Sequence, residues 1–315
     1  MSATLVSKIK GYLTSRLPWI WLASACGLAL PVVASLLAES TLAWVADLAI
    51  HWQWQYAALA LSISLIHLAM QRSLLALVMV ITTLVMTTLN FGPLSLGRIS
   101  SVNREPSLSV ASFNLNLDNH QAPGLDNWVA SEGPDVLALF EVTPQHAPLI
   151  ERLKGSLRYV IKQEQDDQFG VALLSRVPFD RAQVKTHKGS TPYIEAKIKL
   201  NGKPVLLRAI HPMPPISSAD RATRDELISA VAQRGYEPLL ILGDFNASPW
   251  ALAMRELSNK GIKRATSLQP THTLYGGLPI DHILATEAHW QVVSAGTGGD
   301  FGSDHRLVWA SLRTR

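Results

Sequence analysis

The chain has 315 residues, of which 48% are hydrophobic and 17% are charged. This composition excludes a disordered or collagen-like chain, and the charged fraction is low for a purely soluble protein. The formal net charge is only +4 and the basic residues are scattered, so the sequence does not indicate a nucleic-acid-binding face. The single cysteine, Cys26, excludes an intramolecular disulfide.

The charge is unevenly distributed along the chain. Residues 1–97 contain only six charged residues, namely Lys8, Lys10, Arg16, Glu39, Asp47 and Arg72. The uncharged segment 17–38 is roughly 33 Å long as a helix, which is enough to cross a bilayer. Further apolar segments follow at 55–70 and 73–91. We therefore expect residues 1–97 to be a membrane anchor with transmembrane helices over about 17–38, 55–70 and 73–91.

The positions of the bases predict how this anchor is oriented. Three bases precede the first helix and Arg72 lies between the second and third, whereas the loop 39–54 carries only acids. Basic loops stay in the cytoplasm, so three crossings place everything after the anchor on the opposite side. In a Gram-negative cell that side is the periplasm, so we expect a multi-pass inner-membrane protein whose remaining chain is periplasmic. Segment 41–50 is apolar enough to leave open whether the number of crossings is odd or even, although Asp47 in its middle argues against a separate crossing.

After a linker at 98–107, the pattern changes to short apolar runs separated by polar, Gly- and Pro-rich loops. The runs predict strands at 108–113, 136–140, 170–174, 193–200, 204–210, 238–242, 280–285 and 306–312. Helices fit between them at about 124–132, 144–154, 218–234 and 249–259. The mixture predicts one α/β domain with a two-sheet or sheet-and-helix core.

Polar residues recur where these apolar strands begin or end. They are Asn114, Asn116, Glu141, His211, Asp244, Asn246, Asp281, Asp304 and His305. Singly, each is explained as a turn former or a helix cap. Together they favour a functional site, because strand ends of a buried sheet meet at one rim. Their oxygens suit a hard cation, and their imidazoles suit acid–base chemistry.

Six short motifs occur in a characteristic order: SFNLN at 112–116, LFE at 139–141, AIHP at 209–212, GDFNASPW at 243–250, IDH at 280–282 and GSDH at 302–305. With these motifs the chain resembles the endonuclease/exonuclease/phosphatase superfamily over about 108–312. The HPMPP stretch and the three-helix anchor are most similar to its bacterial membrane-anchored branch. The resemblance implies a four-layer α/β sandwich at 108–315, with two packed β-sheets flanked by helices and a phosphoester-cleaving site at one edge.

The resemblance also implies a metal site. Glu141 would hold a Mg²⁺ or Mn²⁺ ion, with Asn114 close by and Asp304 assisting. A hard divalent ion keeps several waters and clamps phosphate oxygens. His272, in PTHT, precedes the Asp281 strand and is a candidate to line the pocket, but it has no partner that the sequence identifies, so the favoured interpretation is an exposed loop residue.

The same resemblance assigns the catalytic roles. His305 would contact or deprotonate at the reacting phosphate, and Asp281 would fix its tautomer. Asn246 would bind the phosphate or orient Asp244, and His211 would stabilise the transition state or protonate the leaving oxygen. Whether His305 or Asp244 is the general base stays open.

These observations predict a membrane-anchored, divalent-metal-dependent phosphodiesterase. Lipid-derived or small phosphodiesters are slightly preferred as substrates, because the chain lacks a dense basic strip and the anchor brings the site to a lipid bilayer. One alternative is an extracytoplasmic DNA or RNA nuclease. Another is a non-catalytic membrane scaffold, although such chains tend to lose site residues that are all present here. The expected partners are the phosphate-ester substrate and the lipid bilayer, and the sequence leaves protein partners unknown.

Overall fold

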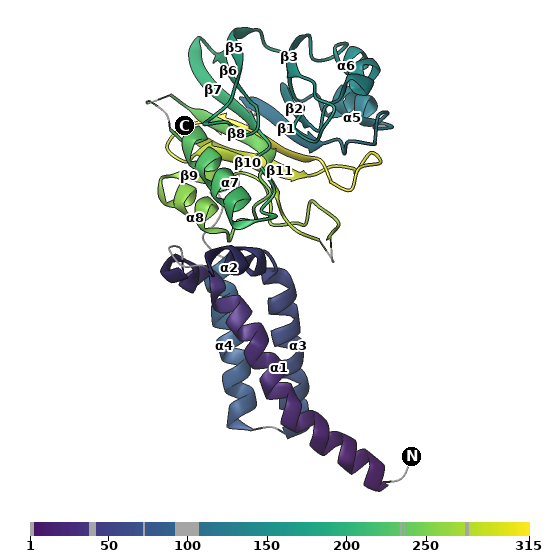
Figure 1. Cartoon of the computed structure of the whole chain (residues 1–315), viewed down its shortest axis with the longest axis vertical. Coiled ribbons are helices and arrows are strands. Elements are labelled where there is room, and N and C mark those ends of the chain that lie inside the picture. The colour runs from purple at the N-terminus through teal and green to yellow at the C-terminus, as the bar shows by residue number, and fades with distance from the viewer. Residues whose placement is uncertain are drawn as a thin grey trace. The chain divides into compact units, whose positions relative to one another are not determined.

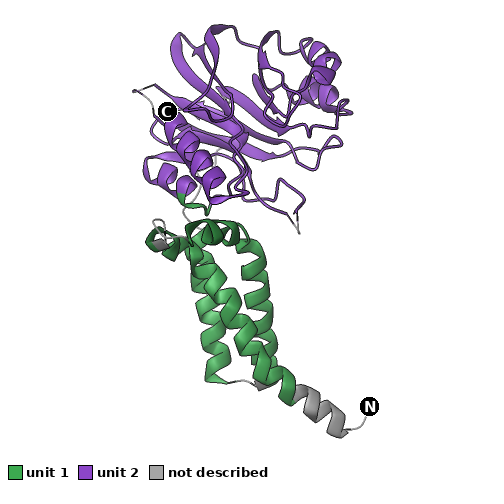
Figure 2. Cartoon of the chain, viewed as in Figure 1, with its two compact units in different colours: residues 1–93, 250–252 green, residues 94–249, 253–315 purple. Residues whose placement is uncertain are grey.

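The computed structural model describes residues 3–37, 42–71, 73–91, 107–233, 235, 237–274 and 277–315. The chain divides into two units, one with residues 1–93 and 250–252, the other with residues 94–249 and 253–315 (Figure 2). Arg72 and the predicted linker, apart from Ser107, lie outside the described residues.

The first unit is helical (Figure 1). Its helices are α1 (Ala3–Leu37), α2 (Ala43–Ile50), α3 (Gln53–Gln71) and α4 (Leu74–Phe91). The apolar segments expected at 17–38, 55–70 and 73–91 correspond to α1, α3 and α4. The short α2 was not predicted. It buries Ala43, Ala46, Asp47 and Ile50, which lie on one helix face at spacings of three and four residues.

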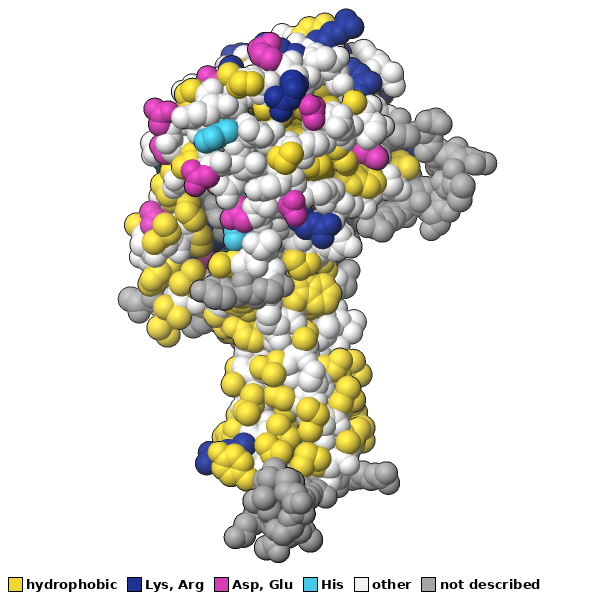
Figure 3. Space-filling view, turned by 90° about the vertical axis from the view of Figure 1, so that its right-hand side faces the viewer, with side chains coloured by type: hydrophobic (Ala, Val, Ile, Leu, Met, Phe, Trp, Pro, Cys, Tyr) yellow, Lys and Arg dark blue, Asp and Glu magenta, His cyan; other side chains and the backbone are white. Residues whose placement is uncertain are grey.

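Two helical segments of this unit, Gly11–Leu36 and Leu74–Phe91, are long and apolar enough to cross a membrane. The second expected crossing, at 55–70 in α3, is not among them, because that helix also carries Gln53, Gln55 and His67. Hydrophobic side chains cover the visible outer surface of the unit (Figure 3).

Polar side chains instead face the inside of the helical unit. Pro31 in α1 has no N–H, so the carbonyl of Gly27 lacks its helical donor. The Gln53 side-chain amide donates to that carbonyl at 3.0 Å. Asn90 donates to the Leu28 carbonyl at 2.7 Å and to the Gln53 oxygen at 2.9 Å. The network links α1, α3 and α4 and satisfies polar groups that an apolar surrounding would leave unpaired.

The second unit contains two six-stranded mixed sheets. The first is built from β1 (Leu108–Asn114), β2 (Val136–Phe140), β3 (Tyr159–Gln163), β4 (Val171–Ser175), β11 (Trp290–Thr297) and β12 (Val308–Thr314), in the order β11-β12-β1-β2-β4-β3. The second is built from β5 (Phe179–Lys185), β6 (Tyr193–Leu200), β7 (Lys203–Ile210), β8 (Leu239–Asp244), β9 (Ile262–Arg264) and β10 (Asp281–Thr286), in the order β5-β6-β7-β8-β10-β9. All eight expected strands form.

Helices cover the outer faces of the packed sheets (Figure 1). They are α5 (Leu125–Glu132), α6 (Ala147–Leu153), α7 (Ser218–Val231) and α8 (Leu252–Asn259). Residues such as Val110, Phe140 and Leu207 fill the core between the sheets, while Phe113 and Leu139 pack under α5 and α6. Central strands are therefore buried on both faces, and the expected four-layer sandwich is confirmed.

The topology brings particular strand ends to one edge. Each sheet has one parallel pair, β1 with β2 and β7 with β8, so their carboxyl ends point the same way. β10 runs antiparallel to β8, which sets Asp281 opposite Asp244. β12 runs antiparallel to β1, so the chain just before it, including His305, lies at the same edge.

Candidate active site

Asn114 joins two carboxylates that come from different sheets. It ends β1 and is fully buried, Glu141 directly follows β2, and Asp244 ends β8. The Asn114 side-chain nitrogen donates to Glu141 Oε1 at 3.0 Å and to Asp244 Oδ2 at 3.1 Å. The strand-end residues expected to form a site are thus in direct contact.

Three residues of this edge have left-handed backbone conformations that disfavour side chains. Their φ angles are 59° at Glu141, 64° at Asn116 and 47° at Asn246. Such conformations cost about 1–3 kcal/mol each and persist only where neighbouring contacts impose them. Here the Leu117 N–H donates to Glu141 Oε2 at 2.8 Å, and the Asn246 N–H donates to Asp244 Oδ1 at 3.0 Å. The backbone strain is concentrated where the carboxylates are held.

His305 and Asp281 form a buried pair. Nδ1 of His305 lies 2.9 Å from Asp281 Oδ2, and its Nε2 lies 3.6 Å from Asp244 Oδ2. Thr271 fixes Asp281, whose N–H donates to the threonine hydroxyl at 3.0 Å. Burial lowers the pKa of His305, but the charges of Asp281 and Asp244 outweigh it and raise that pKa to about 10. The imidazole is therefore protonated at neutral pH.

Asp244 faces a second histidine. Its Oδ2 lies 3.5 Å from Nε2 of His211, which is also buried. Burial opposes ionisation of Asp244, but the two histidine charges and the hydrogen bonds outweigh it and lower its pKa. Asn246 does not touch this carboxylate with its side chain. It donates instead to the Pro212 carbonyl at 3.0 Å, which holds the segment that carries His211.

Asp304 occupies a more exposed position. Its Oδ1 accepts from the Asn116 side chain at 2.8 Å, and its Oδ2 lies 3.3 Å from Nε2 of His272. The hydrogen bond from His272 holds the pKa of Asp304 well below its usual range. Within the described part of the chain, no direct contact joins Asp304 to Glu141. The interpretation of His272 as a partnerless exposed residue was wrong, because it is half-buried and its ring centroid lies 4.5 Å from that of His305.

The donor set fits a hard divalent cation. Glu141 Oε1 and Asp244 Oδ2 both accept from the Asn114 side-chain nitrogen, so two carboxylates and an amide gather at this edge. Oxygen atoms arranged in this way are the ligands that Mg²⁺ and Mn²⁺ prefer. Ligand atoms of Asp244, Asp281 and His305 also lie within 4.8 Å of one another, but the hydrogen bond to Asp281 already commits one nitrogen of His305.

The profile of the Endonuclease/Exonuclease/phosphatase family matches residues 111–305. The chain belongs to this family. Enzymes of the endonuclease/exonuclease/phosphatase family hydrolyse phosphoesters with divalent metals, so the chain is a phosphoric ester hydrolase. No match was found among curated proteins.

Solved structures of the endonuclease/exonuclease/phosphatase family share the fold. Humanized D. rerio TDP2 is 18% identical, with a TM-score of 0.55 and coverage of 66% of this chain and 99% of that one. An AP endonuclease from Archaeoglobus fulgidus is 16% identical, with a TM-score of 0.53 and coverage of 64% and 98%. A protein of the family from Beutenbergia cavernae is 19% identical, with a TM-score of 0.54 and coverage of 67% and 72%. At these identities the likeness concerns the fold.

The family's GDFN motif needs its glycine for a packing reason. A Cβ atom at Gly243 would lie 2.1 Å from the backbone oxygen of Ile210. Real atoms do not approach so closely, so any side chain would push β8 away from β7. That displacement would separate Asp244 from His211, which the two strands deliver to the site.

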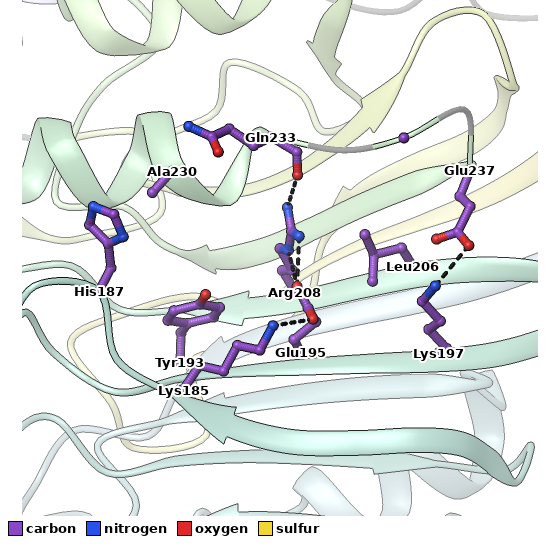
Figure 4. A pocket seen from close by; sticks show the side chains of 11 residues that line it. Lys185, His187, Tyr193, Glu195, Lys197, Leu206, Arg208, Ala230, Gln233 and Glu237 are labelled. Atoms are coloured by element: carbon purple, nitrogen blue, oxygen red, sulfur yellow. Dashed lines mark hydrogen bonds and ion pairs between the residues drawn. The ribbon is translucent and has the colours of Figure 1, made fainter.

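A polar pocket of about 560 Å³ lies away from these family residues (Figure 4). Its walls come from β5, β6, β7 and the chain after α7. The Arg208 guanidinium donates to Glu195 and to the carbonyls of Val231 and Gln233. Arg208 thus caps the carboxyl end of α7 and links it to the sheet. The charged residues that line this pocket therefore form a structural ion-pair network.

Sequence reasoning missed the supporting roles of Thr271 and His272, and it named Asn116 only as one of the strand-end residues. Thr271 accepts from the Asp281 backbone, and Asn116 donates to Asp304. Asn116 lies in the SFNLN motif at the end of a predicted strand, so the sequence did mark it as a candidate site residue. No sequence feature marked Thr271 as part of the site or identified a partner for His272, because their roles depend on how the 271–273 segment pairs with the chain around His305.

Proposed function

We propose that this member of the endonuclease/exonuclease/phosphatase family is a membrane-anchored, divalent-metal-dependent phosphodiesterase of lipid-derived or other small phosphodiesters. The observation that carries the proposal is the buried contact of Asn114 with Glu141 and Asp244, beside the Asp281–His305 pair. Hydrolysis of a phosphodiester needs groups that bind a cation, move a proton and stabilise negative charge. This edge supplies them as carboxylates, an amide and a charged imidazole.

Three residues would hold the cation. Glu141 is the principal ligand, with Asn114 beside it and Asp304 assisting, and the ion is Mg²⁺ or Mn²⁺. When bound, the ion neutralises charge on the phosphate oxygens. The hydrogen bonds of Glu141 to Asn114 and Leu117 pre-orient its carboxylate for this task.

The remaining site residues carry out the proton chemistry. Asp244 takes the proton of the attacking water, because its lowered pKa keeps it ionised. His305 is protonated and donates from Nε2 to a phosphate oxygen, while Asp281 holds its other nitrogen. His211, which approaches the same Asp244 oxygen as His305, stabilises charge on the leaving oxygen or protonates it. Asn246 positions the Pro212 segment on which His211 lies.

The test uses the full-length protein in detergent with bis-p-nitrophenyl phosphate. We expect hydrolysis with Mg²⁺ or Mn²⁺ and none with a chelator. Equal rates with and without chelator would contradict a metal-dependent mechanism. If no metal supports hydrolysis of this substrate, of phospholipid vesicles or of oligonucleotides, that result would favour the non-catalytic scaffold alternative.

We also propose that α1, α3 and α4 cross a bacterial inner membrane and that the catalytic unit is periplasmic. The apolar outer surface and the internal network of Gln53 and Asn90 support this arrangement. A periplasm-dependent reporter fused after Arg315 is expected to be active. A reporter that is active only in the cytoplasm would contradict three crossings.

Exposed apolar residues favour a lipid substrate. In the described part of residues 107–315, the exposed large hydrophobic side chains are Ile216, Leu274 and Tyr159. Ile216 is 72% exposed and lies five residues after His211, in a segment stiffened by three prolines. Leu274 is 43% exposed and lies two residues after His272. Both therefore leave the site on short connections and could enter a lipid surface.

Replacing both Ile216 and Leu274 by Ser tests this lipid contact. Burying an aliphatic side chain contributes about 1.5–3 kcal/mol, so losing two corresponds to about 3–6 kcal/mol and we expect roughly a 10²- to 10⁴-fold increase in the vesicle concentration at half-maximal rate. The substrate is a vesicle of phosphatidylethanolamine and phosphatidylglycerol. Hydrolysis of bis-p-nitrophenyl phosphate is expected to be unchanged. Tyr159→Ser, which removes the third exposed side chain, is the matched control, and an equal loss there would contradict the assignment.

Two structural neighbours favour the nuclease alternative, the AP endonuclease from Archaeoglobus fulgidus and a TDP2 complex with DNA. A structure of D. rerio TDP2 contains a single-strand DNA product, and that protein is 17% identical with a TM-score of 0.55. Should this chain also cut nucleic acid, oligonucleotides would be hydrolysed faster than vesicles, with a rate that falls steeply with salt. That outcome would replace the lipid substrate while leaving the metal chemistry unchanged.

A further inference from the structure

His272 is fixed beside the catalytic residues by backbone pairing. The backbone of His272 forms an isolated antiparallel β-bridge with that of His305. On either side of that bridge, the Thr273 N–H donates to the Asp304 carbonyl at 3.1 Å and the Arg306 N–H donates to the Thr271 carbonyl at 2.7 Å. The two imidazole rings consequently meet edge to face, at an interplanar angle of 78°.

The hydrogen bonds of His272 determine its tautomer. The Leu274 N–H donates to Nδ1 of His272 at 3.0 Å, so this nitrogen is an acceptor. A neutral imidazole carries one N–H, which must then be on Nε2. Nε2 lies 3.3 Å from Asp304 Oδ2. His272 is therefore a donor to this carboxylate.

With this bond, both oxygens of Asp304 have a donor. Oδ1 accepts from the Asn116 side chain at 2.8 Å and Oδ2 faces His272. Asp304 is exposed, and its other side-chain donors in the described part of the chain, Asn116 and Ser303, both lie at Oδ1, so His272 is the side chain that holds Oδ2. Donors at both oxygens hold the carboxylate in one orientation toward the site.

The same tautomer argues against His272 as a metal ligand. Ligand atoms of His272, Asp304 and His305 lie within 4.8 Å of one another, a spacing that a cation could bridge. A ligating imidazole must offer a lone pair to the metal. In His272 the Nδ1 lone pair accepts from Leu274 and Nε2 carries the hydrogen, so neither nitrogen is available.

We propose that His272 is a positioning residue, which orients Asp304 through its Nε2–H and supports the His305 ring by edge-to-face contact. The inference rests on the proposed function, in which Asp304 assists the cation. Groups that orient a metal ligand typically affect metal affinity or activity by about 10- to 100-fold.

Two conservative substitutions separate the nitrogen atoms of His272. In His272→Gln the amide nitrogen replaces Nε2 and can still donate to Asp304. In His272→Asn the amide replaces Nδ1, which can accept from Leu274 but cannot reach Asp304. We expect His272→Asn to weaken Mn²⁺ binding by about 10- to 100-fold, and His272→Gln to stay within a few-fold of wild type.

The measurement is Mn²⁺ binding to the full-length, substrate-free protein, followed by electron paramagnetic resonance. With bis-p-nitrophenyl phosphate, kcat is expected to fall in His272→Asn with little change in KM, because the substrate itself does not touch His272. The thermal midpoint of each variant shows whether it is folded. If His272→Asn does not fold, the ¹⁵N shifts of His272 in the wild type decide, and a hydrogen on Nδ1 overturns the proposal.

Three results would overturn this inference. Wild-type affinity and kcat in His272→Asn would show that Asp304 needs no donor. Equal losses in both variants would show that the hydrogen bond is not the cause. A wild type that hydrolyses phosphodiesters without binding Mn²⁺ would remove the metal from both the inference and the proposed function, whereas the first two results leave the proposed function standing.

Discussion

Glu141→Gln is expected to lower the metal-dependent kcat of phosphodiester hydrolysis by about 10³-fold. The substitution keeps the size of the side chain and an oxygen that can accept from the Leu117 N–H, but it removes the negative charge. A bound metal supplies several kcal/mol of charge stabilisation, and each ~1.4 kcal/mol corresponds to a tenfold change in rate. Stopped assays with bis-p-nitrophenyl phosphate over a range of Mg²⁺ and Mn²⁺ concentrations measure the loss.

The matched control for this variant is Glu151→Gln. Glu151 is exposed and forms an ion pair with Lys154 on the surface of the described structure, so the kcat of this variant should equal that of the wild type. Thermal midpoints with and without Mn²⁺ separate ligand loss from misfolding, because a cation that binds only the folded state raises the midpoint. Glu141→Gln should lose that rise. A variant that keeps both the rise and wild-type kcat would refute the assignment of Glu141 as the principal ligand.

The fold could be predicted from the sequence wherever strands are buried. β2 and β6 form at the expected residues, and the other six expected strands lie within a few residues of their predictions. The strands not predicted are β3, β5, β9 and β11, which are the four edge strands of the two sheets. Edge strands alternate less clearly and carry polar residues that discourage further pairing, as in the largely exposed β3. Hydrophobic periodicity is weakest where a strand has only one neighbour.

The site could be predicted to the extent that it depends on strand ends. Asn114, Glu141 and Asp244 meet because parallel pairs place their carboxyl ends at one edge. The helper residues depend on loops instead. His272 acts through a single backbone bridge formed far along the chain, and no local pattern in the sequence indicates such a pairing.

His305→Ala is expected to lower kcat/KM by about 10²- to 10⁴-fold, the usual contribution of a positioned acid–base group. The variant loses both the donor to the phosphate and the partner of two buried carboxylates, Asp281 and Asp244. His187→Ala is the matched control, because His187 faces Glu226 at 3.7 Å and lines the polar pocket away from the site. Its activity should be that of the wild type.

Asp281→Asn is expected to reduce activity less than His305→Ala and to change its pH dependence. Burial lowers the pKa of His305, and the Asp281 charge is the largest influence that raises it to about 10. Because this folded-state pKa lies above the ordinary 6.5, the stabilisation by His305 is complete just below pH 6.5 and is lost as the pH rises through about 10. Burial raises the pKa of Asp281, so the ion pair is also lost in acid, where that carboxylate takes up a proton. Removing the Asp281 charge lowers the pKa of His305, so the stabilisation by protonated His305 is lost at a lower pH.

The pH profile of this variant also decides which residue is the base. If protonated His305 binds the phosphate and Asp244 is the base, kcat/KM declines toward pH 10 in the wild type and at lower pH in Asp281→Asn. If neutral His305 were the base, activity would instead rise with pH, and the rise would move to lower pH in the variant. The lowered pKa of Asp244 and the raised pKa of His305 favour the first profile, because the two groups then hold the protonation states that each role requires at neutral pH.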